Sequence, residues 1–259
     1  MPEVKKYAPG SPSWVELATT DEKGALAFYR ALFSWKDSPQ PMGEGRFYHI
    51  QQIRGLDAAA LYEQSPEEKK SMPAHWTVYF TVAHVDQTAA RVKGLGGNLV
   101  MPPFDVMEAG RMAMAQDPLG AFFALWQPKN HIGCRIRDEV GALNWVELVT
   151  TDSKKAARFY SALLGLETSK MPGPMDYTLL RVAGKDVAGI FDMTKDMPPM
   201  PPAWMAYFEV GVVGRAAKKA QSLGGKVLLQ PKTIPEVGRF AAVQDPQGAV
   251  FSIFKPSAM

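Results

Sequence analysis

The pattern of hydrophobic and polar positions that opens the chain returns about half a chain length later. Residues 13–21 read Ser-Trp-Val-Glu-Leu-Ala-Thr-Thr-Asp, and residues 144–152 read Asn-Trp-Val-Glu-Leu-Val-Thr-Thr-Asp. Valine and leucine alternate with tryptophan and glutamate, which predicts a strand with one apolar face. The other face carries Trp14 and Glu16 in the first copy, and Trp145 and Glu147 in the second, because successive strand side chains point to opposite sides.

Further motifs recur in the same order after each copy of this strand. They are Phe28-Tyr29 and Phe159-Tyr160, Leu95-Gly96-Gly97 and Leu223-Gly224-Gly225, Gly110-Arg111 and Gly238-Arg239, and residues 116–121 and 244–249, which share Gln-Asp-Pro-x-Gly-Ala. Ordered repetition of this kind indicates a tandem duplication. We therefore predict two domains, 1–128 and 141–259, joined by a polar linker at 129–140.

Each half divides again into two units of one helix and four strands. In the first unit, Asp21 is a predicted helix cap, and apolar residues follow helical spacing as far as Phe33. The other predicted helices are 85–95, 153–164 and 214–223, and the first of these stops at a Gly-Gly pair. In the first half, strands are also predicted near Trp35 and over 47–53, 57–62, 76–83, 98–101, 111–115 and 121–126. The polar stretch 65–71 ends the first unit, and the proline-rich run 198–202 predicts a stiff connector between the third and fourth.

The resulting βαβββ unit occurs four times, over about 13–63, 75–127, 144–193 and 203–255. This order of elements predicts an α+β fold.

Composition narrows the class of protein. The 259 residues are 46% hydrophobic and 21% charged, as in globular proteins. The net charge of +3 is spread along the chain, so we expect no nucleic acid partner. No apolar run approaches the roughly 18 residues of a membrane span, and the N-terminus does not read as a secretion signal. Cys134 is the only cysteine, which excludes an intramolecular disulfide and a thiolate-rich metal site within one chain. We expect a cytoplasmic protein.

These motifs together resemble the vicinal oxygen chelate superfamily, which includes glyoxalase I, bleomycin-resistance proteins and extradiol dioxygenases. The resemblance rests on the strand-Thr-x-Asp-helix opening, Phe-Tyr near the helix end, Leu-Gly-Gly, and Asp-Pro-x-Gly before the last strand. It covers nearly the whole chain and is closest to two-domain bacterial members. It implies four βαβββ units paired into two glyoxalase-like domains, each a curled mixed sheet around a cavity.

The superfamily usually holds a metal inside that cavity with His, Glu or Asp. By the resemblance, the corresponding positions are Trp14, Ala60, Thr77 and Ala124 in the first half, and Trp145, Gly189, Met205 and Ser252 in the second. These side chains are poor ligands for a divalent metal, which needs oxygen or nitrogen donors at fixed geometry. We therefore expect no metal and no other cofactor, and this departure argues against glyoxalase or dioxygenase activity.

The residues expected to line the two cavities are mostly aromatic. We predict a ligand-binding role for Trp14, His75, Thr77, Tyr79, Phe122, Trp126, Trp145, Met205, Tyr207, Ser252 and Phe254. Glu16 and Glu147 are the candidate catalytic residues, as general bases whose pKa is raised by an apolar pocket. The alternative is structural, with each carboxylate paired to Arg111 or Arg239 of the repeated Gly-Arg motif.

Two further patterns bear on chemistry. His49 and His75 lie in predicted strands and could join Glu16 in a nonstandard metal site, although a lone strand histidine is more often an ordinary hydrogen-bonded residue. His84 and His131 fall in a turn and in the linker. Arg111 and Arg239 could bind an anion, or pair with the aspartates of Asp-Pro-x-Gly.

Two hypotheses follow. The first is a metal-independent protein, similar to bleomycin-resistance proteins, that binds a small aromatic or apolar molecule as a monomer or homodimer. The second is a lyase, isomerase or oxygenase-like enzyme in which Glu16 or Glu147 is the base.

Overall fold

The structure is a computed structural model, and it describes all residues except 1–2, 173–175, 196, 198–199 and 258–259. The first half contains β1 (Pro12–Thr19), α1 (Glu22–Phe33), β2 (Lys36–Gly43), β3 (Arg46–Ile53), β4 (Leu56–Glu63), α2 (Pro66–Ser71), β5 (His75–Thr81), α3 (Val85–Gly94), β6 (Asn98–Val106), β7 (Gly110–Gln116) and β8 (Phe122–Pro128). The second half contains β9 (Leu143–Thr150), α4 (Ser153–Leu164), β10 (Glu167–Lys170), β11 (Tyr177–Val182), β12 (Lys185–Asp192), β13 (Ala203–Glu209), α5 (Val213–Ser222), β14 (Lys226–Ile234), β15 (Gly238–Gln244) and β16 (Val250–Pro256).

Each half forms one eight-stranded mixed sheet. The strand orders are β2-β3-β4-β1-β5-β8-β7-β6 and β10-β11-β12-β9-β13-β16-β15-β14, so the two halves have the same topology. In both, the opening strands of the two units pair antiparallel at the centre of the sheet, β1 with β5 and β9 with β13. The α+β fold of four βαβββ units is therefore confirmed, and the units pair within a half.

The predicted helix starts are explained by side-chain caps. Asp21 accepts a hydrogen bond from the backbone N–H of Gly24 at 3.0 Å, and Asp152 accepts one from Lys155 at 2.8 Å. Such caps satisfy backbone donors that the first turn of a helix leaves free. The repeated Thr-Asp therefore fixes where both long helices begin.

Three segments differ from the prediction. The polar stretch 65–71 contains the short helix α2, which begins with a capping box between Ser65 and Glu68. Strand β6 continues through Pro102 and Pro103, which is possible because it lies at the edge of its sheet. The linker was expected to be polar, yet it buries Cys134 and Ile136. Of the predicted connector 198–202, Pro198 and Pro199 lie outside the described residues.

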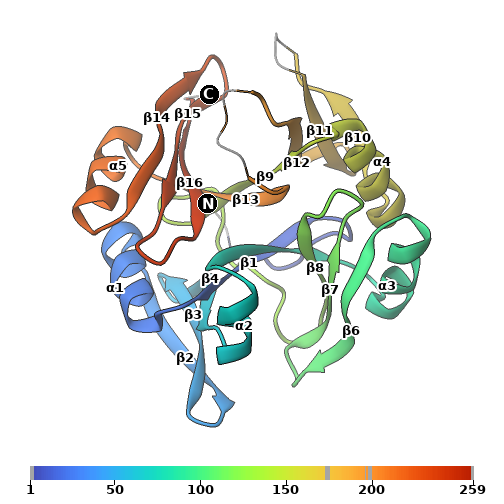
Figure 1. Cartoon of the computed structure of the whole chain (residues 1–259), viewed down its shortest axis with the longest axis horizontal. Helices are drawn as coiled ribbons and strands as arrows, with labels where there is room; N and C mark the ends of the chain where they lie inside the picture. The colour runs from blue at the N-terminus through green and yellow to red at the C-terminus, as the bar shows by residue number, and fades with distance from the viewer. Residues whose placement is uncertain (1–2, 173–175, 196, 198–199, 258–259) are drawn as a thin grey trace.

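The two sheets share one aromatic core. Trp76 on β5 lies 5.1 Å from Phe208 on β13, measured between ring centroids, and Phe80 lies 5.0 Å from Trp204. On either side of this contact, a helix of one half lies next to a helix of the other half, α1 next to α5 and α3 next to α4 (Figure 1). Each half thus completes its hydrophobic core with the other. No helix within the described part of the chain is long and apolar enough to cross a membrane.

The repeated motifs meet across this shared core. The hydroxyl of Tyr29 donates to Asp245 of the opposite half at 2.9 Å and accepts a hydrogen bond from Trp76 Nε1 at 3.1 Å. Tyr160 repeats the arrangement with Asp117 at 3.2 Å and Trp204 at 2.9 Å. The Phe-Tyr and Asp-Pro-x-Gly motifs therefore join the two halves reciprocally.

The Leu-Gly-Gly motif serves the same interface. A Cβ atom on Gly97 would lie 2.6 Å from the Gln116 carbonyl and 3.0 Å from the ring of Phe159, and one on Gly225 would lie 3.1 Å from Phe28. Only glycine fits such a close approach. Three of the shared motifs, Phe-Tyr, Asp-Pro-x-Gly and Leu-Gly-Gly, therefore hold the halves together.

Candidate functional site

The tryptophan and glutamate of each opening strand lie on one face of the sheet, which we call the inner face. On β1 and β5, Trp14 lies opposite Tyr79 and Glu16 lies opposite Thr77, and directly paired residues share a face. The predicted alternation is therefore correct in the first half. The second half repeats it, with Trp145 opposite Tyr207 and Glu147 opposite Met205.

On the first inner face, Glu16 is held by tyrosines. The hydroxyl of Tyr79 donates to Glu16 Oε1 at 2.8 Å, and Tyr48 on β3 also hydrogen-bonds this carboxyl group. The Tyr48 hydroxyl in turn accepts a hydrogen bond from Trp14 Nε1 at 2.9 Å. The tryptophan and the glutamate of the motif are therefore linked through a tyrosine from a different strand.

The second inner face has the same network. Tyr207 donates to Glu147 Oε1 at 2.5 Å, Tyr177 on β11 hydrogen-bonds the same carboxyl group, and Trp145 Nε1 donates to the Tyr177 hydroxyl at 2.9 Å. The two halves therefore contain the same four side chains in the same network.

Both carboxyl groups are biased towards the protonated form. Burial raises the pKa of Glu16, and the hydrogen bonds from Tyr48 and Tyr79 offset part of that rise. Burial likewise raises the pKa of Glu147, against hydrogen bonds from Tyr207 and Tyr177. Each inner face therefore presents a weakly acidic carboxyl group surrounded by aromatic rings.

The predicted arginine partners of these glutamates are wrong. Arg111 Nε donates to Asp86 at 2.8 Å, and the Arg111 guanidinium also lies 3.4 Å from Asp105. Arg239 donates to the hydroxyl of Thr233 and the carbonyl of Pro231. The physical reason is strand alternation: Met112 pairs with Trp126 on the inner face, which puts Arg111 on the opposite face.

Pairing of these arginines with the aspartates of Asp-Pro-x-Gly is also wrong. The carboxyl group of Asp117 accepts hydrogen bonds from the backbone N–H groups of Leu119 and Ala121 within its own turn. Asp245 does the same with Gln247 and Ala249. The aspartates therefore shape their turns and bind the tyrosine of the other half.

The suggested His49–His75–Glu16 metal site is not formed. Tyr48 faces Glu16, so His49, the next residue on β3, points to the other face. There its Nδ1 lies 2.8 Å from Asp37 and its Nε2 lies 3.2 Å from Glu22. His75 reaches the inner face, but its Nδ1 contacts the carbonyl of Pro73 at 2.8 Å. Within the described residues, no three His, Cys, Asp or Glu side chains are grouped to hold a metal ion.

The other residues predicted to line the cavities lie on the inner faces of the two sheets. Phe122 and Trp126 lie on the first inner face, on the strand beside Thr77 and Tyr79. Ser252 and Phe254 lie on the second inner face, on the strand beside Met205 and Tyr207. Sequence reasoning missed Tyr48 and Tyr177. They occupy the same place in each repeat, and aligning the third strands of the two halves would have revealed them.

The second inner face carries a hydrophobic cluster of its own. Buried Val149, Met205 and Tyr207 form its base. Half-buried aromatic and methionine side chains pack around that base, namely Trp145, Phe191, Met193, Met197, Met200, Phe240 and Phe254. Methionine adapts to ligand shape and aromatic rings supply large contact areas, so the cluster suits an apolar ligand.

Comparison with known proteins agrees with the topology. A model of the Glyoxalase/Bleomycin resistance protein/Dioxygenase superfamily matches residues 11–125 and 142–253. The chain is 40% identical over 261 residues to “Putative glyoxylase CFP32” of Mycobacterium tuberculosis (strain CDC 1551 / Oshkosh), covering 99% of each protein. It is 34% identical over 263 residues to the anthracycline biosynthesis protein DauV of Streptomyces sp. (strain C5), covering 96% of this chain and 94% of the relative.

Solved structures show the same fold at low sequence identity. The 2,3-dioxygenase LapB from Pseudomonas sp. KL28 matches with a TM-score of 0.66 and 15% identity, over 98% of this chain and 94% of that one. The Mn(II)-bound glyoxalase from Novosphingobium aromaticivorans matches with a TM-score of 0.66 and 14% identity, over 95% and 82%. With both halves matched by the family model, the chain belongs to the Glyoxalase/Bleomycin resistance protein/Dioxygenase superfamily.

Proposed function

We propose that the protein binds a small aromatic or otherwise apolar molecule on the inner face of its second half, without a metal. The observation that carries this proposal is the cluster of half-buried aromatic and methionine side chains over Met205 and Tyr207. Partly exposed apolar side chains that converge on a few polar groups are the usual composition of a small-molecule site.

The polar group at the centre of this site is Glu147. Its pKa is raised by burial, so the carboxyl group has a weakened tendency to ionise beside an apolar ligand. A protonated carboxyl group donates and accepts hydrogen bonds, and it adds no charge that would need a partner. A neutral ligand can therefore lie against this face without leaving a buried charge unpaired.

The residues present do not fit the metal that relatives hold. The positions implied by the family resemblance carry an indole at Trp145, a thioether at Met205, a hydroxyl at Ser252 and no side chain at Gly189. Glu147 lies next to them, but it is hydrogen-bonded by two tyrosines. Hard divalent ions need several oxygen or nitrogen donors, which this set does not supply.

The name of one relative supports an aromatic ligand. DauV is named as an anthracycline biosynthesis protein, and anthracyclines contain fused planar rings. A planar ring system suits the tryptophan, tyrosine and phenylalanine side chains of the second inner face.

Fluorescence titration of the purified full-length chain would test this function. The ligands are hydroxylated naphthalenes and anthraquinones, and the control is cyclohexanol, which offers no ring face. We expect saturable binding of the aromatic set that is unchanged by EDTA. Absence of saturable binding across the set would refute the proposal, and so would binding that requires a stoichiometric metal ion.

A second candidate is an isomerase in which Glu147 moves a proton between two positions of one substrate. The raised pKa favours it, because a general base works best when its pKa lies near the working pH. Glu147→Gln would then abolish turnover while leaving ligand affinity within a few-fold. Turnover that survives this substitution would exclude Glu147 as the base.

A further inference from the structure

The two halves differ in what lies beside the tryptophan of the inner face. In the first half, the linker residue His131 places its ring edge-on against Trp14, with ring centroids 4.5 Å apart. Trp126 Nε1 also donates to the His131 carbonyl at 2.9 Å. Loss of hydration lowers the pKa of His131, so its ring favours the neutral form. A neutral heteroaromatic ring of the chain itself therefore fills this part of the first inner face.

The linker then enters the seam where β1 and β4 separate. These strands pair only from Glu16 and Ala60 onwards, so their first residues lie apart. The backbone N–H of Cys134 donates to the Ser13 carbonyl at 2.7 Å, and the backbone N–H of Arg135 donates to the Asp57 carbonyl at 2.7 Å. At Gly133 a Cβ atom would lie 2.2 Å from the Ser13 carbonyl oxygen, which shows how closely the linker fits.

The equivalent seam of the second half holds a pocket in the part of the chain that the structure describes. Strands β9 and β12 pair only from Glu147 and Gly189 onwards. Where they separate, a pocket of about 340 Å³ is lined by Asn144, Trp145, Asp186 and Val187. These positions repeat Ser13, Trp14, Asp57 and Ala58, the residues around the filled seam of the first half.

The aromatic side chains beside the two seams also differ in how deeply they are buried. Trp14 is 4% exposed and Trp126 is 7% exposed in the first half. Their counterparts Trp145 and Phe254 are both half-buried. The two first-half side chains are therefore more deeply buried than their counterparts in the second half.

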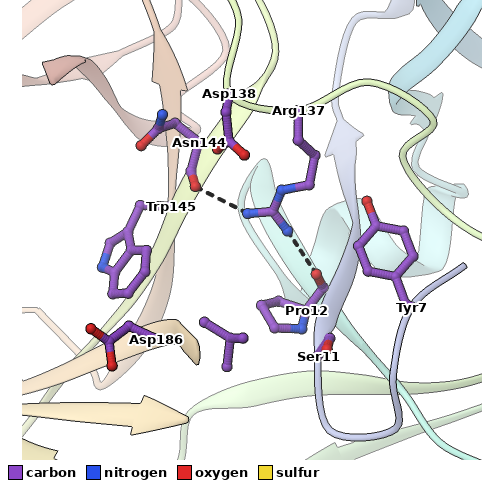
Figure 2. Close-up of a pocket in the computed structure, with 9 residues that line it drawn as sticks. Tyr7, Ser11, Pro12, Arg137, Asp138, Asn144, Trp145 and Asp186 are labelled. Atoms are coloured by element: carbon purple, nitrogen blue, oxygen red, sulfur yellow. Dashed lines mark hydrogen bonds between the residues drawn. The ribbon is translucent and has the colours of Figure 1, made fainter. Parts of the chain in front are cut away.

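The far wall of the pocket is built by the N-terminal segment and the linker (Figure 2). Arg137 donates there from Nη1 to the Pro12 carbonyl at 2.8 Å and from Nη2 to the Asn144 carbonyl at 3.0 Å. Asp186 pairs with Arg181 at 2.9 Å. The carboxyl group of Asp138 also lines the pocket, and loss of hydration raises its pKa. The Asp138 carboxyl group is therefore one acceptor that a donor on a ligand can meet in this pocket.

We propose that the linker is a built-in occupant of the first seam, and that the pocket beside Trp145, at the edge of the second inner face, takes the single ligand of the chain. The ligand class is a planar aromatic compound with a hydroxyl or amino group. Its ring packs against Trp145 as the His131 ring packs against Trp14, and its donor faces Asp138. A volume of about 340 Å³ suits two or three fused rings. The existence of an aromatic ligand rests on the proposed function, whereas the place and the number of sites are new.

Titration of the full-length chain with 1-naphthol tests this inference, with 1-methoxynaphthalene as the matched probe that lacks the donor. We expect one equivalent of 1-naphthol per chain. Trp145→Ala lowers its affinity about tenfold, as expected for a lost aromatic contact worth about 1.4 kcal/mol. Asp138→Asn lowers the affinity for 1-naphthol and leaves that for 1-methoxynaphthalene unchanged.

Val187→Trp provides a second variant, because a large side chain at this half-buried position fills the pocket while leaving Glu147 intact. We expect it to abolish binding with a normal melting temperature. Two equivalents per chain, or binding that survives both Trp145→Ala and Val187→Trp, would overturn the placement. If binding instead responds to Glu147→Gln alone, the proposed function stands and this placement fails. No binding of any aromatic probe would refute both.

Discussion

The reciprocal Tyr–Asp contacts between the halves give a stability prediction that can be worked from the structure. In Tyr29→Phe, Asp245 loses a hydrogen bond of 2.9 Å and the indole N–H of Trp76 loses its acceptor at 3.1 Å. A hydrogen bond to a charged group contributes about 1.5–3 kcal/mol, and an unsatisfied buried donor costs at least about 1 kcal/mol more. We therefore expect the free energy of unfolding to fall by about 3 kcal/mol. For a chain of this size, that corresponds to a melting temperature about 6–12 °C lower.

A double-mutant cycle in urea separates this contact from a general loss of stability. Asp245→Asn keeps an oxygen for the turn but weakens the acceptor for Tyr29. We expect a coupling energy between Tyr29 and Asp245 on the order of 1–2 kcal/mol. The matched control pairs Tyr29 with Asp117, which belongs to the other network, and their coupling should be below about 0.5 kcal/mol. Equal coupling in the two cycles would refute the cross-half assignment.

Three further outcomes can be checked. Burial raises the pKa of Glu147, so the stabilisation that comes from its bound proton is present in acid and is lost as the pH rises through the folded pKa. Glu147→Gln should flatten this part of the pH–stability curve, and an unchanged curve would contradict the raised pKa. His131→Ala should lower the free energy of unfolding, measured by thermal melting, by about 1–3 kcal/mol, because it leaves space beside Trp14. The same substitution at the exposed His84 should lower it by less than about 0.5 kcal/mol, and equal effects would contradict a first seam filled by the linker. Since the folded pKa of His131 is lowered, the wild type should lose stability as the pH falls below the unfolded histidine pKa of about 6.5, and His131→Ala should lose less.

The fold could be predicted because its information is repeated in the sequence. Alternation in the opening strands, the Asp caps and the glycine stops all recur in order, so each weak local pattern is supported by its copy. Helix α2 escaped prediction because it has no buried residue and hence no apolar stripe. The length of β6 was hidden by its two prolines, which an edge strand tolerates and a central strand does not.

The candidate site could be predicted only in part. Alternation placed Trp14 and Glu16 on one face, but it said nothing about which distant strand would meet them. Tyr48 reaches Glu16 because β3 lies two strands away from β1, a fact of sheet order that local patterns do not contain. The position of His131 depends on the path that the linker takes between β1 and β4. The linker is polar, so its sequence does not predict that it would be buried there.

A crystal structure of the full-length protein soaked with 1-naphthol would show where the ligand lies. We predict a single naphthol per chain, with its ring against Trp145 in the seam between β9 and β12 and its hydroxyl group directed at Asp138. The corresponding seam of the first half should still contain the linker, with His131 against Trp14. Ligand bound beside Glu16 in the first half, or a metal ion bound to Glu16 or Glu147, would contradict this account.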